Sequence, residues 1–306
     1  MPMSEEIQFD RSFESKPGVA EQIAPGVRRI LCDNPSPYTF KGTNTYIVGE
    51  GSVAIIDPGP ADPRHIEAIL AAIRNETVAQ ILVTHTHRDH SPAAAAIKEA
   101  TGANTFAEGP HRPARALHLG ETPPLDSGGD EDFMPDHRLA DGEVIEGKGY
   151  ALETVFTPGH CANHVAFGLR GSNVLFSADH VMGWATSIVA PPDGSMSDYM
   201  ASLHKLEQRP ETVYLPGHGG AVQNAKKLVA QYIEHREARE NAILRKLSRG
   251  ESDIPGIVQA IYIGLDPRLT KAAALTTFAH LETLVERNLV STEDTLSLGG
   301  RYRLTA

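Results

Sequence analysis

The chain has 306 residues, 41% of them hydrophobic, and a formal net charge of −11 at pH 7. That charge disfavours a general nucleic-acid-binding protein, because such binding depends on lysine and arginine side chains that neutralise phosphates. No apolar run approaches the roughly 18–20 residues that cross a bilayer, and the acidic N-terminus lacks the apolar segment of an export signal. With only two cysteines, we expect a cytoplasmic protein without a membrane partner.

The first hundred residues alternate short apolar runs with turns, which predicts strands and two helices after a polar N-terminal arm. The expected elements are the arm at 1–26, strands at 26–32, 43–49, 52–56 and 79–83, and helices at 63–74 and 92–101. Gly102 is expected to end the second helix.

The strand expected at 79–83 leads straight into segment 84–90, which contains three histidines and one aspartate. Imidazole and carboxylate groups are ligands that zinc accepts. His85 and His87 alternate, so an extended backbone would point both side chains the same way. Asp89 and His90 would then turn toward a neighbouring position. Four ligands within six residues can serve two metal ions but would crowd one.

Three later residues, His160, Asp179 and His218, each follow an apolar run that ends in a turn. A single histidine is usually an ordinary surface or core residue. Here, however, five of fourteen histidines fall into one spacing with two aspartates, and metal-ligand residues seldom cluster so by chance. The pattern therefore predicts a site for two metal ions.

The middle of the chain contains a long segment, 108–136, that is rich in proline, glycine and aspartate and has no clear period. Such a loop within a compact domain is either functional or disordered, so it is either a lid over the metal site or an acidic surface loop. The elements expected after it are strands at 152–156, 165–169, 174–176 and 212–215, and helices at 198–208 and 221–249. Two β-rich halves with helices outside predict an α/β fold, namely a four-layer αββα sandwich.

The helix expected at 221–249 is locally basic, with seven lysine or arginine residues against three glutamates from Lys226 onward. One interpretation is a solvated helix face. The alternative is a surface that follows the backbone of a phosphate-bearing substrate such as RNA, in which Lys226, Lys227 and Arg236 would take part.

Residues 251–306 predict helices followed by a small hairpin, which is typical of a winged-helix-like domain. We therefore expect two domains, at 1–250 and 251–306. The second carries seven acidic and five basic residues and no arginine-rich reading face. A packing or dimerisation role is favoured over nucleic-acid binding, and the second of these roles would give a homodimer.

The complete motif resembles that of the metallo-β-lactamase superfamily, whose first motif is an aspartate that ends a strand, here Asp57. The resemblance implies one zinc ion held by His85, His87 and His160. It implies a second zinc ion held by Asp89, His90 and His218, and it gives Asp179 the bridging role. Asp57 would orient these groups from behind, and the alternative is a plain turn residue. The candidate catalytic residues are Asp89 and Asp179.

The metal and the reaction are expected from the same residues. Redox members that bind iron usually carry an acid where His87 stands, so an imidazole there favours zinc and hydrolysis, with manganese or iron as alternatives. A site with two zinc ions lowers the pKa of water and stabilises an oxyanion. We therefore expect a dinuclear zinc hydrolase. A redox di-metal protein and a non-catalytic nucleic-acid-binding protein are the weaker alternatives.

Segments 42–46, 198–203, 214–219 and 231–236 resemble the β-lactamase-like protein 2 subfamily. That resemblance implies acyl-thioester hydrolysis for some members and single-strand-specific endoribonuclease activity for others. The expected substrate is a thioester, ester or similar small-molecule bond, and the alternative is short single-stranded RNA. The candidates for the substrate wall are Tyr38, Trp184, Thr186 and Tyr199. The residues expected to pack near the site are Cys161, His164 and His180.

Overall fold

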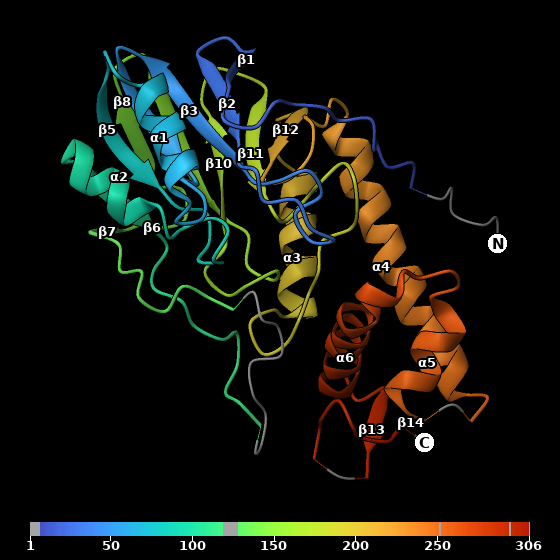
Figure 1. The fold of residues 1–306 in the computed structure, drawn as a ribbon. Coiled ribbons are helices and arrows are strands. Elements are labelled where there is room, and N and C mark those ends of the chain that lie inside the picture. The colour runs from blue at the N-terminus through green and yellow to red at the C-terminus, as the bar shows by residue number, and fades with distance from the viewer. Residues whose placement is uncertain (1–6, 119–127, 251, 294, 306) are drawn as a thin grey trace.

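In the computed structural model, which describes residues 7–118, 128–250, 252–293 and 295–305, two β-sheets lie face to face with helices on their outer sides (Figure 1). The first sheet contains β1 (Ala20–Ala24), β2 (Val27–Leu31), β3 (Asn44–Glu50), β4 (Ser52–Ile56), β5 (Thr77–Leu82), β6 (Asn104–Ala107) and β7 (His137–Arg138), in that spatial order. The second contains β8 (Val144–Gly147), β9 (Tyr150–Phe156), β10 (Val165–Leu169), β11 (Val174–Ala178) and β12 (Val213–Pro216), also in chain order.

Four helices cover the two sheets. They are α1 (Pro63–Ala72), α2 (Ala94–Thr101), α3 (Met196–Glu207) and α4 (Ala225–Leu247). The side chain of Asp62 caps α1 by accepting from the Arg64 amide, and Gly102 ends α2 in the left-handed conformation, as the sequence predicts.

Three apolar layers hold this arrangement together, because each strand alternates its side chains between the two faces of its sheet. In β3, Ile47 faces the first helices, whereas Tyr46 and Val48 face the second sheet. The layer between the sheets also contains Phe167, Phe176 and Leu215. The layer beneath α3 and α4 contains Leu203, Tyr214, Val229 and Tyr232. Helix, sheet, sheet and helix therefore form the predicted four-layer αββα sandwich.

Strand direction places the chemistry of the first sheet. β4 pairs in parallel with β5, so both strands end at the same edge of the sheet. Asp57 follows β4 and segment 84–90 follows β5. In the second sheet β11 and β12 are also parallel, and they deliver Asp179 and His218 to the edge that meets it.

The expectation of a polar arm over 1–26 is wrong for part of that segment. Residues 20–24 form β1, which pairs with β2, and Phe13 is buried beneath the guanidinium of Arg29 at 4.6 Å from its ring centre. The short strands β6 and β8 were not predicted either. Each has only four residues, too few to show a period in the sequence.

The C-terminal residues form a separate cluster around α5 (Ile254–Ile261), a short 3-10 helix (Pro267–Leu269), α6 (Thr270–Glu286) and the hairpin β13 (Val290–Thr292) and β14 (Tyr302–Leu304). Its core includes Ile243 and Leu247 from the end of α4, so this long helix joins the two parts. We propose a domain boundary near residue 250. None of the helices in the described part of the chain has the length and apolar character of a membrane span.

Candidate metal centre

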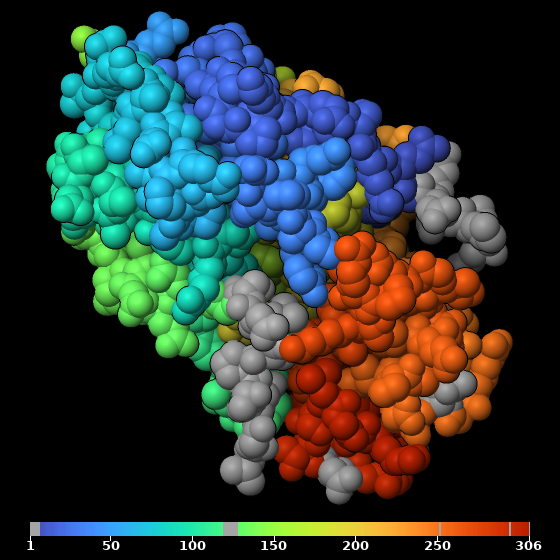
Figure 2. Space-filling view, in the orientation of Figure 1, coloured from blue at the N-terminus to red at the C-terminus, as the bar shows by residue number. Residues whose placement is uncertain are grey.

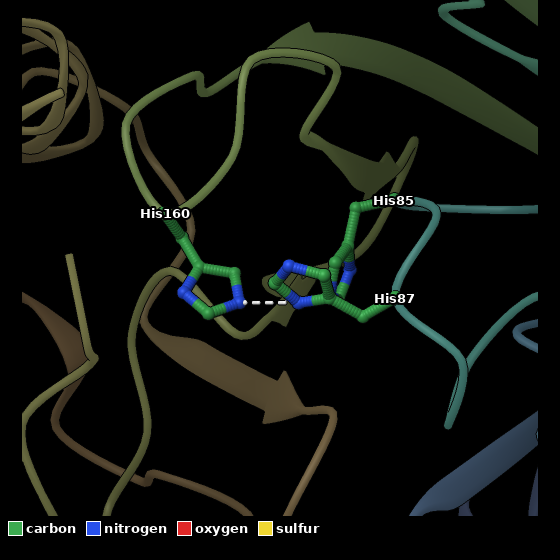
Figure 3. Close-up of side chains that lie close together, drawn as sticks. All are labelled: His85, His87 and His160. Atoms are coloured by element: carbon green, nitrogen blue, oxygen red, sulfur yellow. Dashed lines mark hydrogen bonds between the residues drawn. The ribbon is translucent and has the colours of Figure 1, made fainter. Parts of the chain in front are cut away.

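The first group of converging side chains comes from two loops, one after β5 and one between β9 and β10. His85 and His87 extend from the first loop and His160 from the second, and the three rings meet at a point (Figure 3). His87 Nδ1 lies 3.1 Å from His85 Nε2 and 3.0 Å from His160 Nε2. Nitrogens that each bind one zinc ion at about 2.0–2.1 Å in a tetrahedron lie roughly 3.3 Å apart, close to this spacing.

The second group consists of Asp89, His90 and His218. Asp89 Oδ2 lies 3.4 Å from His90 Nε2 and 3.3 Å from His218 Nε2. Asp179 stands between the two groups: its Oδ2 is 3.2 Å from His218 Nε2 and 3.7 Å from His160 Nε2. The structure thus brings together all seven residues that the sequence singles out as metal ligands.

The outward-facing nitrogens of these rings are held by the protein. Three of them donate to oxygens supplied by backbone or hydroxyl groups: His160 Nδ1 to Ile188 O at 2.7 Å, His218 Nδ1 to Gly42 O at 3.2 Å, and His85 Nδ1 to Thr84 Oγ1 at 3.0 Å. With Nδ1 protonated, the inward Nε2 atom keeps its lone pair. This is the tautomer that metal-ligating histidines adopt.

Asp57 organises the centre from behind. Its Oδ1 accepts from the Thr84 amide at 2.7 Å, and its Oδ2 accepts from Thr84 Oγ1 at 2.7 Å and from His90 Nδ1 at 3.0 Å. The Thr84 hydroxyl therefore donates its hydrogen bond to Asp57, so its oxygen can accept a hydrogen bond from His85 Nδ1. One buried carboxylate in this way sets the orientation of two rings that come from the same loop.

The electrostatics of the centre fit a bound cation. Burial, reinforced by His90 and His87, lowers the pKa of His85 well below its usual value. Burial alone would also lower the pKa of His218, but Asp179 and Asp89 outweigh it and raise that pKa to about 9. His90 Nε2 and Asp179 Oδ1 are buried without a hydrogen-bond partner. Inward lone pairs, two carboxylates and unpartnered buried atoms are what a metal ion satisfies.

Backbone conformation at the strand ends is unusual in two places. Asp57 (φ 50°) and Ala178 (φ 43°) adopt the left-handed region although neither is glycine, and such strain concentrates at functional sites. Gly217, directly before His218, is required for a different reason. A Cβ there would lie 2.3 Å from Asp179 Oδ1 and 2.8 Å from His90 Cε1, so a side chain would displace the Asp179 carboxylate.

A cavity of about 260 Å³ opens onto the centre, and we call it the metal-site cavity. Its floor includes His87, Asp89, His160, Asp179 and His218. Its remaining walls come from Ser36, Tyr38, Thr39, Arg88, Gly128, Met182, Ile188, Ala190 and Asp193. Most of these wall residues carry no motif in the sequence and reach the cavity only through the path of the loops that hold them.

The predicted substrate wall is wrong for Tyr199. Tyr38 lines the metal-site cavity, and Trp184 and Thr186 line a neighbouring cavity. Tyr199 is fully buried in the core beneath α3 and α4 and donates to the carbonyl of His180. The large side chain of Tyr199 serves core packing.

The residues expected to pack near the centre do so. Cys161 is a buried free thiol whose Sγ approaches Asn163 Oδ1 at 3.4 Å. His164 is buried beside His85 with 5.1 Å between ring centres and bonds Thr157 Oγ1 at 2.8 Å. Burial lowers the pKa of His180 to about 3, so the ring is a neutral core group.

The loop at 108–136 contacts the centre through its described ends. His111 Nδ1 lies 3.1 Å from Thr86 Oγ1, Gly129 forms a β-bridge with His87, and Gly128 lines the metal-site cavity. Arg115 reaches the other way and donates through Nε to Glu282 of α6 at 2.8 Å. Residues 119–127, the middle of the predicted lid, lie outside the described residues.

The basic face predicted for α4 is not a single surface. Arg236 is buried at 3% exposure and donates to the carbonyl of Ser187. Arg239 donates to Ile261 O at 2.6 Å, and its guanidinium lies 4.3 Å from the ring centre of Tyr262. Both side chains join α4 to its neighbours, so the prediction that Arg236 belongs to an RNA-binding patch is wrong.

Comparison with known proteins agrees with this geometry. The family model of the metallo-beta-lactamase superfamily matches residues 38–218, and that of the beta-lactamase associated winged helix domain matches 254–300. The beta-lactamase-like protein 2 homolog of Caenorhabditis elegans is 32% identical over 76% of this chain and 74% of its own length. The atrochrysone carboxyl ACP thioesterase of Aspergillus fumigatus is 30% identical over 78% of this chain and 69% of that protein.

Among solved structures, a beta-lactamase domain protein from Burkholderia ambifaria superposes with a TM-score of 0.77 at 23% identity, covering 95% of each chain. This likeness concerns the fold. The matches in sequence cover both the sandwich and the C-terminal domain. The chain therefore belongs to the metallo-beta-lactamase superfamily, as a hydrolase that carries the winged helix domain associated with that fold.

Proposed function

We propose that this hydrolase binds two zinc ions and cleaves thioesters of small acyl groups. The observation that carries the proposal is a cluster of seven candidate ligands, five of which form the floor of the metal-site cavity, beside an apolar wall formed by Met182, Ile188 and Ala190. A relative named as an ACP thioesterase supports the choice of bond. Histidine and carboxylate ligands without any thiolate suit zinc, although their affinity alone does not exclude other divalent ions.

The chain's own residues divide the work. His85, His87 and His160 would hold one ion, Asp89, His90 and His218 the other, and Asp179 would bridge them. When bound there, the two ions supply acidity to water and a positive field for a developing oxyanion. Thr43 Oγ1 donates to Asp89 Oδ2 at 3.4 Å and fixes that carboxylate. The apolar wall would exclude water and accommodate the acyl chain.

The decisive test compares Asp179→Ala with the wild type. Asp179→Ala removes the carboxylate that lies between the two groups of candidate ligands. We therefore expect loss of most bound zinc and a fall in thioester hydrolysis of at least about a hundredfold. Zinc content is measured by mass spectrometry, and turnover is followed with a panel of acyl N-acetylcysteamine thioesters.

Asp141→Ala is the matched control, because Asp141 pairs with Lys205 at 2.8 Å on an exposed part of the surface. That variant should retain zinc and activity. Full zinc occupancy with wild-type turnover in Asp179→Ala would overturn the assignment.

The endoribonuclease alternative gains no support of its own from the geometry, since Arg236 and Arg239 are engaged within the protein. It is tested with the same two proteins and a short single-stranded RNA. If the wild type cleaves the RNA but no thioester, and Asp179→Ala cleaves neither, the substrate bond is a phosphodiester and not a thioester. A cytoplasmic setting also belongs to the proposal, because both cysteines are buried free thiols. The homodimer stays a prediction for sedimentation to test.

A further inference from the structure

A second cavity, of about 200 Å³, lies where the C-terminal domain meets the sandwich, and we call it the seam cavity. This cavity adjoins the metal-site cavity, because three residues line both: Tyr38, Met182 and Ile188. On the other side the seam cavity is lined by C-terminal residues: Tyr262, Leu265, Leu269, Ala272, Ala273 and Thr276. In Figure 2 the blue N-terminal part and the orange C-terminal domain meet along this seam.

One residue that lines the seam cavity is a buried arginine without an acidic partner. Arg236 is 3% exposed, donates to the carbonyl of Ser187 and lies with its guanidinium 5.0 Å from the ring centre of Tyr199. Its Nε–H has no hydrogen-bond partner. Within the described residues it forms no ion pair. A buried charge of this kind is costly unless an anion compensates it.

The surroundings of Arg236 favour an anion as the missing partner. None of the residues that line the seam cavity is an aspartate or glutamate, whereas Arg11 adds a second cation. This composition is notable in a chain with a net charge of −11. The indole N–H of Trp184, another lining residue, is also buried without a partner and provides a second donor.

We propose that the seam cavity binds a carboxylate at the far end of the acyl group whose thioester lies over the metal centre. The substrate class is then a thioester of an acid that carries a second carboxylate, and this assignment rests on the proposed thioesterase function. A planar carboxylate matches the fork of one guanidinium and balances its single charge. A phosphate monoester carries nearly two charges and would need more donors than these apolar walls provide.

Binding can be measured without catalysis, because Trp184 is the only tryptophan of the chain and lines the cavity. Zinc-loaded full-length protein is titrated with octanoate, octanol and octyl phosphate while tryptophan fluorescence is followed. We expect a saturable change with octanoate and at least about tenfold weaker binding of octanol, since a charge-assisted hydrogen bond is lost. Equal binding of octanol, or tighter binding of octyl phosphate, would overturn the assignment.

Arg236→Gln should weaken octanoate binding by about tenfold or more. Arg239→Gln is the matched control, because Arg239 lies one turn further along α4, also donates to a backbone carbonyl and packs on an aromatic ring, and does not line the cavity. A carboxylate that contacts only the zinc ions would bind Arg236→Gln as tightly as the wild type, which would overturn the proposal. If Arg236→Gln does not fold, the titration is repeated with metal-free wild type: octanoate binding of unchanged strength supports the seam cavity, and its loss would overturn the proposal.

Hydrolysis separates this proposal from the thioesterase function itself. The monothioester of octanedioic acid with N-acetylcysteamine should show a lower KM than the octanoyl thioester, and Arg236→Gln should abolish that preference while kcat for the octanoyl thioester is kept. Octanoate binding that depends on Arg236, with neither thioester cleaved, would reject the thioesterase function but retain the anion site. Hydrolysis of both thioesters with equal KM would reject the anion site and retain the function.

Discussion

At the scale of single residues, Asp57 orients the candidate ligands although it does not line the metal-site cavity. Its two oxygens accept three hydrogen bonds, two from Thr84 and one from His90. Thr45 Oγ1 donates to the backbone carbonyl of Asp57 at 2.6 Å and in turn accepts from His65. The residue is therefore fixed at both its backbone and its side chain, and the orientation of His85 and His90 follows from it.

Replacing one of these oxygens by an amide tests this role. In Asp57→Asn the amide group would face a donor on Thr84 or His90, so the rings lose their fixed orientation. We expect zinc affinity to fall by about 10–100-fold, measured by titration against a competing chelator. Asp62→Asn is the matched control, because it changes the cap of α1 without touching the centre. Equal zinc affinity in the two variants would reject the orienting role of Asp57.

The sequence allows the ligands to be predicted better than the groups that support them. The seven residues stand out because ligand side chains are rare and their spacing is regular. By contrast, His160 and His218 are held by the carbonyls of Ile188 and Gly42. Every residue has a carbonyl, so no sequence pattern distinguishes these two. The same holds for Met182 and Ala190 in the cavity wall, which only the path of the loop after β11 brings to the site.

At the scale of elements, the loop at 108–136 connects the two domains. Arg115 pairs with Glu282 of α6, and both side chains are largely buried, at 24% and 10% exposure. Arg112, three residues earlier, pairs within the loop with Glu108. The first pair therefore ties the loop to the winged helix domain, whereas the second lies within the loop, where Arg112 also donates to the carbonyl of Ala162 at 3.4 Å.

Arg115→Gln should loosen this attachment. Glu282 would lose a charged partner in a largely buried position, so we expect a loss of about 1–3 kcal/mol in the free energy of unfolding. Amide hydrogen exchange of residues 108–118 should also become faster. Arg112→Gln should cost less than about 1 kcal/mol, because its guanidinium is more exposed and its pair is local. A larger effect of Arg112→Gln than of Arg115→Gln would contradict the assignment.

The sequence predicts the bounds of some elements more accurately than the exposure of others, for a physical reason. Strands β4 and β10 have the predicted bounds because glycines and polar turns flank apolar runs. The sequence does not show which basic side chains of α4 face solvent, because charge alone does not determine burial. Arginine can bury its stem and satisfy its guanidinium with carbonyls and aromatic rings, as Arg236 and Arg239 do.

At the scale of the whole molecule, the metal centre lies at an edge where both sheets end. Its ligands come from loops after β5, β9, β11 and β12, each anchored by a strand within the shared core. Hydrogen bonds to protein groups orient four of the five rings. The arrangement of the centre is therefore part of the fold.

Removal of the metal should consequently leave the fold intact. After treatment with a chelator we expect unchanged near-ultraviolet circular dichroism at 25 °C and a lower thermal midpoint. The loss corresponds to about 2.7 kcal/mol when zinc had been present at a hundred times its dissociation constant. Zinc added back should restore activity without a refolding step. Collapse of the near-ultraviolet signal on chelation would show that the metal builds the site.

The anchoring of four rings by their outer nitrogens, those of His85, His90, His160 and His218, would make a bound ion an exchangeable component. A site whose ligand side chains are already fixed can lose its ion and take up cobalt, manganese or iron while the surrounding protein stays the same. Differences in rate among such preparations then report the chemistry of the ion. In a living cell the same property means that occupancy follows supply. The metal that fills this enzyme is then decided by what the cell makes available when the folded chain meets it.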